Sequence, residues 1–269
     1  MRIRNAKFVG LTFGAGLAIA VSTFAASAST VLTDGTFSNV TATSTFAGTG
    51  SGGSFVTDPG TTVTLAPSAC TSCGNPGAAL QGNFDSTIST AIGAITAGGG
   101  YIDNLLHYTP STAGAIFSIN ASADKDVTVT GISGTQEGNS LRILIQQNGN
   151  YYLAAISEPA WTAPGTTGFQ TFSVSGLSAS SFVEINFANG FLTNSAHPDF
   201  SSTGVEIFFG VDFQAQGVDG ANSTAVYDNL DITINPTPLP AALPLFATGL
   251  GALGLLGWRR KRKAAAIAA

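Results

Sequence analysis

The chain has 269 residues, of which 44% are hydrophobic and only 9% are charged. Eight of its ten lysines and arginines lie near the two ends, whereas all fifteen acidic residues lie between Asp34 and Asp231. Residues 29–235 thus hold two cations and fifteen acids, a formal net charge of −13. Such a surface repels nucleic acid and attracts cations such as Ca²⁺. We exclude DNA and RNA as partners.

The first 28 residues have the three parts of a secretory signal peptide. Three cations, Arg2, Arg4 and Lys7, precede an apolar stretch from Phe8 to Val21. Small residues follow, and Ala26-Ser27-Ala28 matches the A-x-A cleavage pattern. We predict recognition by the export machinery, cleavage between Ala28 and Ser29, and an ectodomain of residues 29–235. An uncleaved N-terminal anchor is the alternative.

Residues 29–235 are rich in Gly, Ser, Thr, Ala and Phe, a composition that favours strands over helices. From Val205 to Phe213 every odd-numbered residue is apolar, so one face of a strand is buried, while Glu206 and Asp212 point the other way. Asn148-Gly149 separates two strand candidates and is a strong hairpin signal. Other predicted strands are 115–120, 126–132, 141–147, 151–156, 169–175, 182–187 and 225–234. We predict an all-β fold, an antiparallel β-sandwich of the jelly-roll kind.

Two segments depart from this alternation. Ile88, Ile92 and Ile95 have helical spacing, and Gly98–Gly100 follow them, so we predict a short helix that starts near Asp85 and stops at these glycines. A loop with buried isoleucines is the alternative. Residues 36–64 are so rich in Gly, Ser and Thr that strand register is weakly specified, which predicts long loops or an edge hairpin.

Cys70 and Cys73 form a C-x-x-C in a neighbourhood of loop-forming residues. The strand-to-helix context of a redox motif is missing, so in an oxidising compartment we predict a local disulfide. A zinc site needs two further ligands, and nothing in the sequence brings the two histidines, His107 and His197, together.

No catalytic motif supports an enzyme. The G-x-S-x-G pattern of serine hydrolases is absent. A glycosidase needs only two carboxyl groups about 5 to 10 Å apart, and Glu184, Glu206 and Asp212 are the candidates for the outer face of neighbouring strands. We predict that the protein is not an enzyme and keep the glycosidase as the less favoured alternative.

Polysaccharide binding needs aromatic platforms with hydrogen-bonding side chains beside them. The candidate platforms are Tyr151, Trp161 and Tyr227, with Gln146, Asn148 and Asn186 nearby in the sequence. Tyr151 and Tyr152 point to opposite faces of a strand, so only one of them can serve a given platform. Trp161 lies between two prolines and is predicted in a loop. A purely structural surface protein without a small ligand is the alternative.

After Pro236 the chain has an apolar stretch from Ala241 to Trp258 and then a basic cluster, Arg259, Arg260, Lys261, Arg262 and Lys263. As a helix the stretch is roughly 27 Å long, just short of a hydrocarbon core of about 30 Å. Cations stay on the cytoplasmic side of a membrane. We predict a single transmembrane helix within residues 236–263, a basic cytoplasmic stop, and a short tail of residues 264–269.

Pro238-Leu239-Pro240-Ala241, together with the short helix and the basic end, resembles the VPLPA-CTERM signal, a variant of the PEP-CTERM sorting signals of Gram-negative bacteria. Thr237 stands where that family usually has valine. The resemblance implies processing by an exosortase-type membrane protease. The protein is then held transiently in the inner membrane and afterwards reaches the cell surface or the extracellular matrix. An ordinary single-pass anchor is the alternative.

The segments Leu32–Phe37 and Tyr227–Ile232 resemble the first and last strands of carbohydrate-binding-module jelly rolls. The resemblance implies that these terminal strands pair. It also implies a structural calcium ion near Asp34 and Asp228, although Ser38 stands where those families have a glutamate ligand.

Overall fold

The computed structural model describes residues 28–51, 54–57, 60–86, 95–131, 137–162, 164–217 and 220–237. The apolar part of the predicted signal peptide, the sorting motif, the predicted transmembrane helix and the basic cluster lie outside these residues. Within them, no helix has the length and hydrophobicity needed to cross a bilayer.

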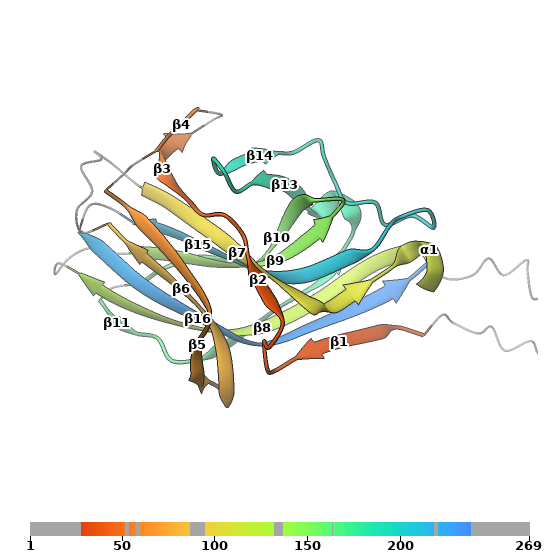
Figure 1. The fold of residues 1–269 in the computed structure, drawn as a ribbon, viewed down its shortest axis with the longest axis horizontal. Helices are drawn as coiled ribbons and strands as arrows, with labels where there is room; N and C mark the ends of the chain where they lie inside the picture. The colour runs from red at the N-terminus through yellow and green to blue at the C-terminus, as the bar shows by residue number, and fades with distance from the viewer. Residues whose placement is uncertain are drawn as a thin grey trace, which may run out of the picture. The chain divides into compact units, whose positions relative to one another are not determined.

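Two antiparallel sheets form the described unit (Figure 1). The seven-stranded sheet has the order β11-β8-β16-β6-β5, with β1 added beside β16 and β12 beside β8. Its strands are β1 (Thr30–Asp34), β5 (Thr62–Gly74), β6 (Gly77–Asp85), β8 (Ile116–Gly131), β11 (Gly165–Thr166), β12 (Gln170–Leu177) and β16 (Ala221–Pro236).

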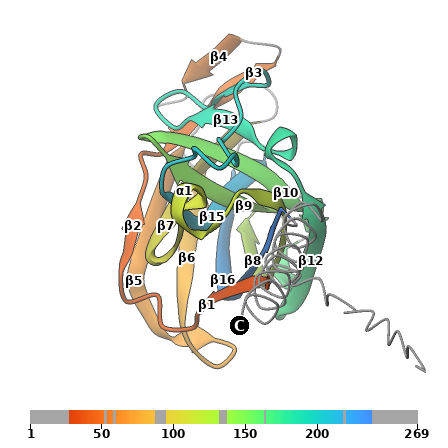
Figure 2. The same ribbon diagram turned by 90° about the vertical axis from the view of Figure 1, so that its right-hand side faces the viewer.

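The nine-stranded sheet has the order β14-β13-β10-β9-β15-β7-β3-β4, with β2 beside β7. Its strands are β2 (Val40–Ala42), β3 (Phe46–Ser51), β4 (Ser54–Thr57), β7 (Ile95–Tyr108), β9 (Glu137–Gln147), β10 (Asn150–Thr162), β13 (Val183–Asn186), β14 (Phe191–Thr193) and β15 (Ile207–Gly217). Two short helices, α1 (Pro110–Ala113) and η1 (Ala179–Ser181), lie in connections. Figure 2 views the unit from the end that carries α1.

The core lies between the two sheets and follows the predicted alternation. Phe209, Val211 and Phe213 of β15 are buried, as the odd-numbered pattern requires. The Phe213 ring meets Tyr227 of the opposite sheet edge to face, with 6.4 Å between ring centres. The predicted antiparallel β-sandwich is therefore confirmed.

Local signals located β8, β9, β10, β12, β13, β15 and β16 but missed the long strands β5, β6 and β7. β9 and β10 form the predicted hairpin, and both turn residues, Asn148 and Gly149, have positive φ. The predicted strands 115–120 and 126–132 are parts of one long strand, β8. Residues 36–64 contain the edge hairpin β3–β4, and β1 pairs with β16 as the resemblance implied.

The helix predicted from Asp85 to Ile95 is wrong at both ends. Asp85 ends β6 and Ile95 begins β7, while residues 87–94 lie outside the described part of the chain. Gly98–Gly100 stop no helix, because they lie inside β7. A Cβ atom at Gly100 would lie 2.5 Å from Leu144 Cδ2, so this glycine allows close packing over the strand.

Candidate functional site

Four side chains from four adjacent strands form a continuous line across the nine-stranded sheet. Tyr151 of β10 is opposite Gln146 of β9, Gln146 is opposite Phe208 of β15, and Phe208 is opposite His107 of β7. Residues directly opposite in antiparallel strands share one face of a sheet. Three strand spacings give the line a length of about 14 Å. We call these four residues the aromatic row.

The aromatic row lies on the face of the sheet that points away from the sandwich core. Its sequence neighbours Ile145 and Phe209 are buried in that core, and side chains alternate along a strand. Tyr151, Gln146 and Phe208 are half-buried and His107 is exposed. These side chains are therefore accessible to a ligand while their backbones are held in a sheet.

Contacts within and around the row orient its rings. Gln146 Nε2 donates a hydrogen bond of 3.3 Å to the Tyr151 hydroxyl. The Tyr151 ring meets Phe187 edge to face at 5.3 Å, and the His107 ring lies 5.9 Å from the Phe208 ring at a tilt of 36°. The platform is thus pre-organised by packing at both of its ends.

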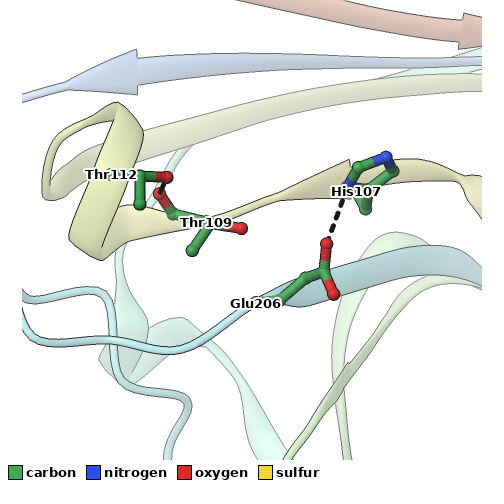
Figure 3. Close-up of polar contacts among 4 residues, drawn as sticks. All are labelled: His107, Thr109, Thr112 and Glu206. Atoms are coloured by element: carbon green, nitrogen blue, oxygen red, sulfur yellow. Dashed lines mark hydrogen bonds and ion pairs between the residues drawn. The ribbon is translucent and has the colours of Figure 1, made fainter.

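A contact between His107 and Glu206 ends the row on the β7 side (Figure 3). His107 Nδ1 lies 2.9 Å from Glu206 Oε1, and the side chains are 51% and 46% exposed. Figure 3 also shows the Thr112 hydroxyl donating to the Thr109 carbonyl oxygen, 3.2 Å away, in the first turn of α1. Glu206 adds an exposed acceptor next to the aromatic rings.

A pocket of about 320 Å³ opens beside Tyr151, at the other end of the row. Its polar lining includes the exposed Asn150 and Asn186, and Phe187 and Ile185 supply apolar surface. The residues that line the pocket are Ser44, Gly149, Asn150, Tyr151, Glu184, Ile185, Asn186, Phe187 and Ala188. The lining is mainly polar, so this pocket offers hydrogen-bond donors and acceptors beside the Tyr151 ring.

A buried carboxyl group, Asp212, lies on the same face beside the half-buried Arg142. Asp212 is directly opposite Arg142 and is fully buried, and neither of its carboxylate oxygens has a hydrogen-bond partner among the described residues. Burial raises the pKa of Asp212 to about 7, although the Arg142 guanidinium favours the ionised form. The sequence assigned Asp212 to the correct face, but its predicted exposure is wrong. Leu144 and Phe187 of an outer apolar cluster lie against Gly100, the residue opposite Asp212 on β7.

The three predicted sugar-binding aromatics have different positions. Tyr151 lies in the row. Tyr227 is only 1% exposed and packs inside the core, so its prediction as a platform is wrong. Trp161 lies in β10 opposite Gly138, not in a loop as predicted, and its side chain is outside the described part of the structure. Of the polar candidates, Gln146 joins the row and Asn186 the pocket.

The candidate glycosidase carboxylates are not assembled. Glu184 is on β13 and Glu206 directly precedes β15, with β10 and β9 between these strands. Three strand spacings separate them by about 14 Å, more than the roughly 10 Å at which two carboxyl groups act on one glycosidic bond. The strand order therefore does not bring Glu184 next to Glu206, and the absence of glycosidase activity stays a prediction.

The predicted calcium ligands lie in separate hydrogen-bond groups. Asp34 faces Asp103. Burial raises the pKa of Asp34, but hydrogen bonds with the Thr36 amide and hydroxyl, the Asp103 side chain and the Phe37 backbone together lower it below its usual value. Asp228 accepts hydrogen bonds from the backbone N–H groups of Asn75 and Asn229. Within the described ranges no three His, Cys, Asp or Glu side chains are grouped to hold a metal. A calcium ion shared by Asp34 and Asp228 stays a prediction.

Cys73 is disulfide-bonded, and Cys70 is the only other cysteine of the chain. Both lie in the last part of β5, where the pairing with β6 is irregular, and not in a loop as predicted. His197 contacts the Phe182 carbonyl oxygen through Nδ1 at 2.6 Å, far in sequence from His107.

The sequence interpretation missed Phe208 and His107. The alternation in residues 205–213 already assigned Phe208 to the outer face, where an aromatic residue is unexpected beside Glu206. His107 carried no such signal, because only the pairing of β7 with β15 brings it next to Phe208.

No protein-family model matches the chain, and no curated protein matches it. Solved structures with some similarity include a family 11 carbohydrate-binding module from Clostridium thermocellum in complex with a β-1,3-1,4-mixed-linked tetrasaccharide. It is 10% identical, has a TM-score of 0.35, and the match covers 77% of this chain and 96% of that chain. The CBM22-1 xylan-binding domain from Paenibacillus barcinonensis is 10% identical with a TM-score of 0.30, and the match covers 79% of this chain and 96% of that chain. An exo-β-agarase is 12% identical with a TM-score of 0.30, and the match covers 67% of this chain and 24% of that chain. These low TM-scores establish neither common ancestry nor a common ligand.

Proposed function

We propose that the ectodomain is exported and binds a neutral polysaccharide along the aromatic row. The observation that carries this proposal is the unbroken line of Tyr151, Gln146, Phe208 and His107 across four strands. A line of about 14 Å fits a chain of sugars better than a single one.

The chemistry of the row suits sugars. A sugar ring offers an apolar face of C–H groups, which packs on an aromatic ring, and a rim of hydroxyl groups, which need donors and acceptors. Tyr151 and Phe208 supply half-buried rings, and Gln146, between them, supplies an amide donor and acceptor. Glu206 and the asparagines of the pocket add acceptors at the two ends of the row.

The charge distribution favours a neutral polysaccharide over an acidic one. Lys125 and Arg142 are the only cations of residues 29–235. Lys125 is buried, and its Nζ donates to the Asn139 carbonyl oxygen at 2.8 Å. Arg142 is half-buried opposite Asp212. Neither cation offers an exposed positive site, and the net charge of −13 repels polyanions.

The proposed route to the outside is the sorting route implied by the C-terminal tail. Pro238-Leu239-Pro240-Ala241 and the basic cluster are proposed to direct the chain to an exosortase-type protease. The apolar helix is then a transient anchor in the inner membrane, and the jelly-roll-like ectodomain acts at the cell surface or in the matrix.

Substitution of the row residues tests the proposal. Tyr151→Ala and Phe208→Ala are each expected to weaken polysaccharide binding about tenfold or more, because each removes a ring that a sugar would cover. Binding is measured by calorimetry with the full-length protein, in a detergent without a sugar headgroup, against soluble β-glucan, xylan, galactomannan and alginate.

Phe117→Ala is the matched control, because it removes a more exposed phenylalanine from the other sheet. It is expected to leave binding unchanged. Absence of binding to every polysaccharide, or equal losses in the control, would contradict the proposal and favour a structural role. Release of reducing sugar during the incubation would favour a hydrolase instead.

A further inference from the structure

One end of the described unit combines exposed apolar side chains with the exit of the C-terminal segment. Figure 1 shows α1, the start of β1 and the end of β16 together at this end. Phe117, at the start of β8, is 66% exposed and is the most exposed large hydrophobic residue of the described chain. Val31 of β1 is 57% exposed, and Val205 is 45% exposed.

Hydrogen bonds hold the C-terminal strand next to Phe117. Asn235 is opposite Ser118, Pro236 is opposite Ile116, and the Thr237 amide donates to the Ala115 carbonyl oxygen at 2.7 Å. Val205 joins the same end, because the neighbouring Gly204 carbonyl oxygen accepts a hydrogen bond from the Ser111 amide of α1. The chain therefore leaves the sandwich within a few residues of its most exposed aromatic side chain.

Chain length limits how far the apolar stretch can be from this end. Four peptide units join Thr237 to Ala241, where the apolar stretch begins. Fully extended, they span at most about 14 Å. If the stretch spans a bilayer, the lipid surface must lie within this reach of Thr237.

The segments that form this end carry no charge, in a domain of net charge −13. Residues 28–32, 109–120, 200–205 and 232–237 contain no Asp, Glu, Lys or Arg. Three acids flank these segments. Asp199 accepts a hydrogen bond from the Ser201 backbone amide, Glu206 contacts His107, and Asp231 accepts a hydrogen bond from the Thr233 hydroxyl. Exposed apolar side chains on segments that carry no charge of their own suit the boundary between lipid headgroups and acyl chains.

We propose that the end formed by α1, Val31, Phe117 and Val205 is a lipid-contact surface that rests on the bilayer while the C-terminal helix is in place. This inference rests on the membrane insertion of the tail under the proposed function. Phe117 enters the interfacial layer, and the sandwich is held in one orientation instead of swinging freely on its linker. Cleavage of the tail then releases a contact that is too small to hold the domain on the membrane by itself.

Fluorescent probes on one strand test this surface. Phe117 and Thr130 lie near opposite ends of β8, about 43 Å apart, and both are exposed. Phe117→Cys and Thr130→Cys are labelled with an environment-sensitive fluorophore, with the Cys73 disulfide kept oxidised. The mature protein, residues 29–269, is then reconstituted into phosphatidylcholine–phosphatidylethanolamine vesicles. The probe at 117 is expected to shift to shorter emission wavelength and to be quenched by lipids with spin-labelled acyl chains, and the probe at 130 to show neither effect.

Flotation of the vesicles separates the two ways of failing. If the protein floats but the two probes respond alike, the lipid-contact surface is wrong and the inserted tail stands. If the protein does not float, both the inserted tail and the lipid-contact surface are wrong. Polysaccharide binding by the aromatic row is measured independently of both.

Discussion

Replacing Gly210 with alanine is expected to destabilise the sandwich by more than about 3 kcal/mol, or to prevent folding. An ideal Cβ at this position would lie 1.7 Å from the Tyr101 carbonyl oxygen and 2.9 Å from Ile102 Cα. Both are backbone atoms of β7, the strand that pairs with β15 at this point. They cannot rotate away as a flexible side chain would, so the methyl group can be accommodated only by separating two central strands.

Gly35→Ala is the matched control for this substitution. No atom lies within 4 Å of a Cβ at Gly35, and its φ is outside the left-handed region. Its free energy of unfolding is expected to stay within about 0.5 kcal/mol of the original protein. Urea denaturation followed by circular dichroism measures both variants. A Gly210→Ala protein that unfolds at the same urea concentration as the control would disprove the close contact of β15 with β7.

The domain is also expected to lose stability as the pH rises from about 4 to about 7. Burial raises the pKa of Asp212 to about 7, and burial with a neighbouring Asp34 raises the pKa of Asp103 to about 6. Between the ordinary pKa of an aspartate and these values, both groups hold a proton in the folded state and lose it in the unfolded state. The unfolded state therefore binds fewer protons, and the free energy of unfolding falls as the pH rises.

The size of this fall is on the order of a few kcal/mol, since one pKa unit corresponds to about 1.4 kcal/mol. The Asp103 contribution is lost by about pH 6 and the Asp212 contribution by about pH 7. Asp34 has a lowered pKa, so its contribution acts in the opposite sense and is lost only below about pH 4. Urea denaturation at half-unit steps between pH 4 and pH 8 measures the profile.

Isosteric amides identify the groups responsible. Asp212→Asn and Asp103→Asn are each expected to flatten part of the plot of unfolding free energy against pH, because an amide does not titrate. This expectation holds whatever each substitution does to the stability at a single pH. Asp126→Asn is the control, since Asp126 is a half-exposed carboxyl on β8. It is expected to leave the slope unchanged. A protein whose stability rises steadily between pH 4 and pH 7 would show that these carboxyl groups are not buried as protonated acids.

The aromatic row explains why only part of the site was predictable. Tyr151 and Gln146 are neighbours across the hairpin that Asn148-Gly149 predicts, so four consecutive turn and strand residues were enough to relate them. Phe208 and His107 come from β15 and β7, which are about 100 residues apart in the chain. Their proximity depends on the register between these strands, which no local signal specifies.

The alternation of apolar and polar residues, together with the turn residues, predicted β8, β9, β10, β12, β13, β15 and β16, the β9–β10 hairpin and the buried face of β15. These features depend on neighbours within a few positions. The same signals missed β5, β6 and β7. Whether the other face is exposed depends on what lies over it. Asp212 is buried because residues from distant segments cover it, and Tyr227 is buried because the second sheet packs against it. These outcomes arise from long-range packing, which only the tertiary structure decides.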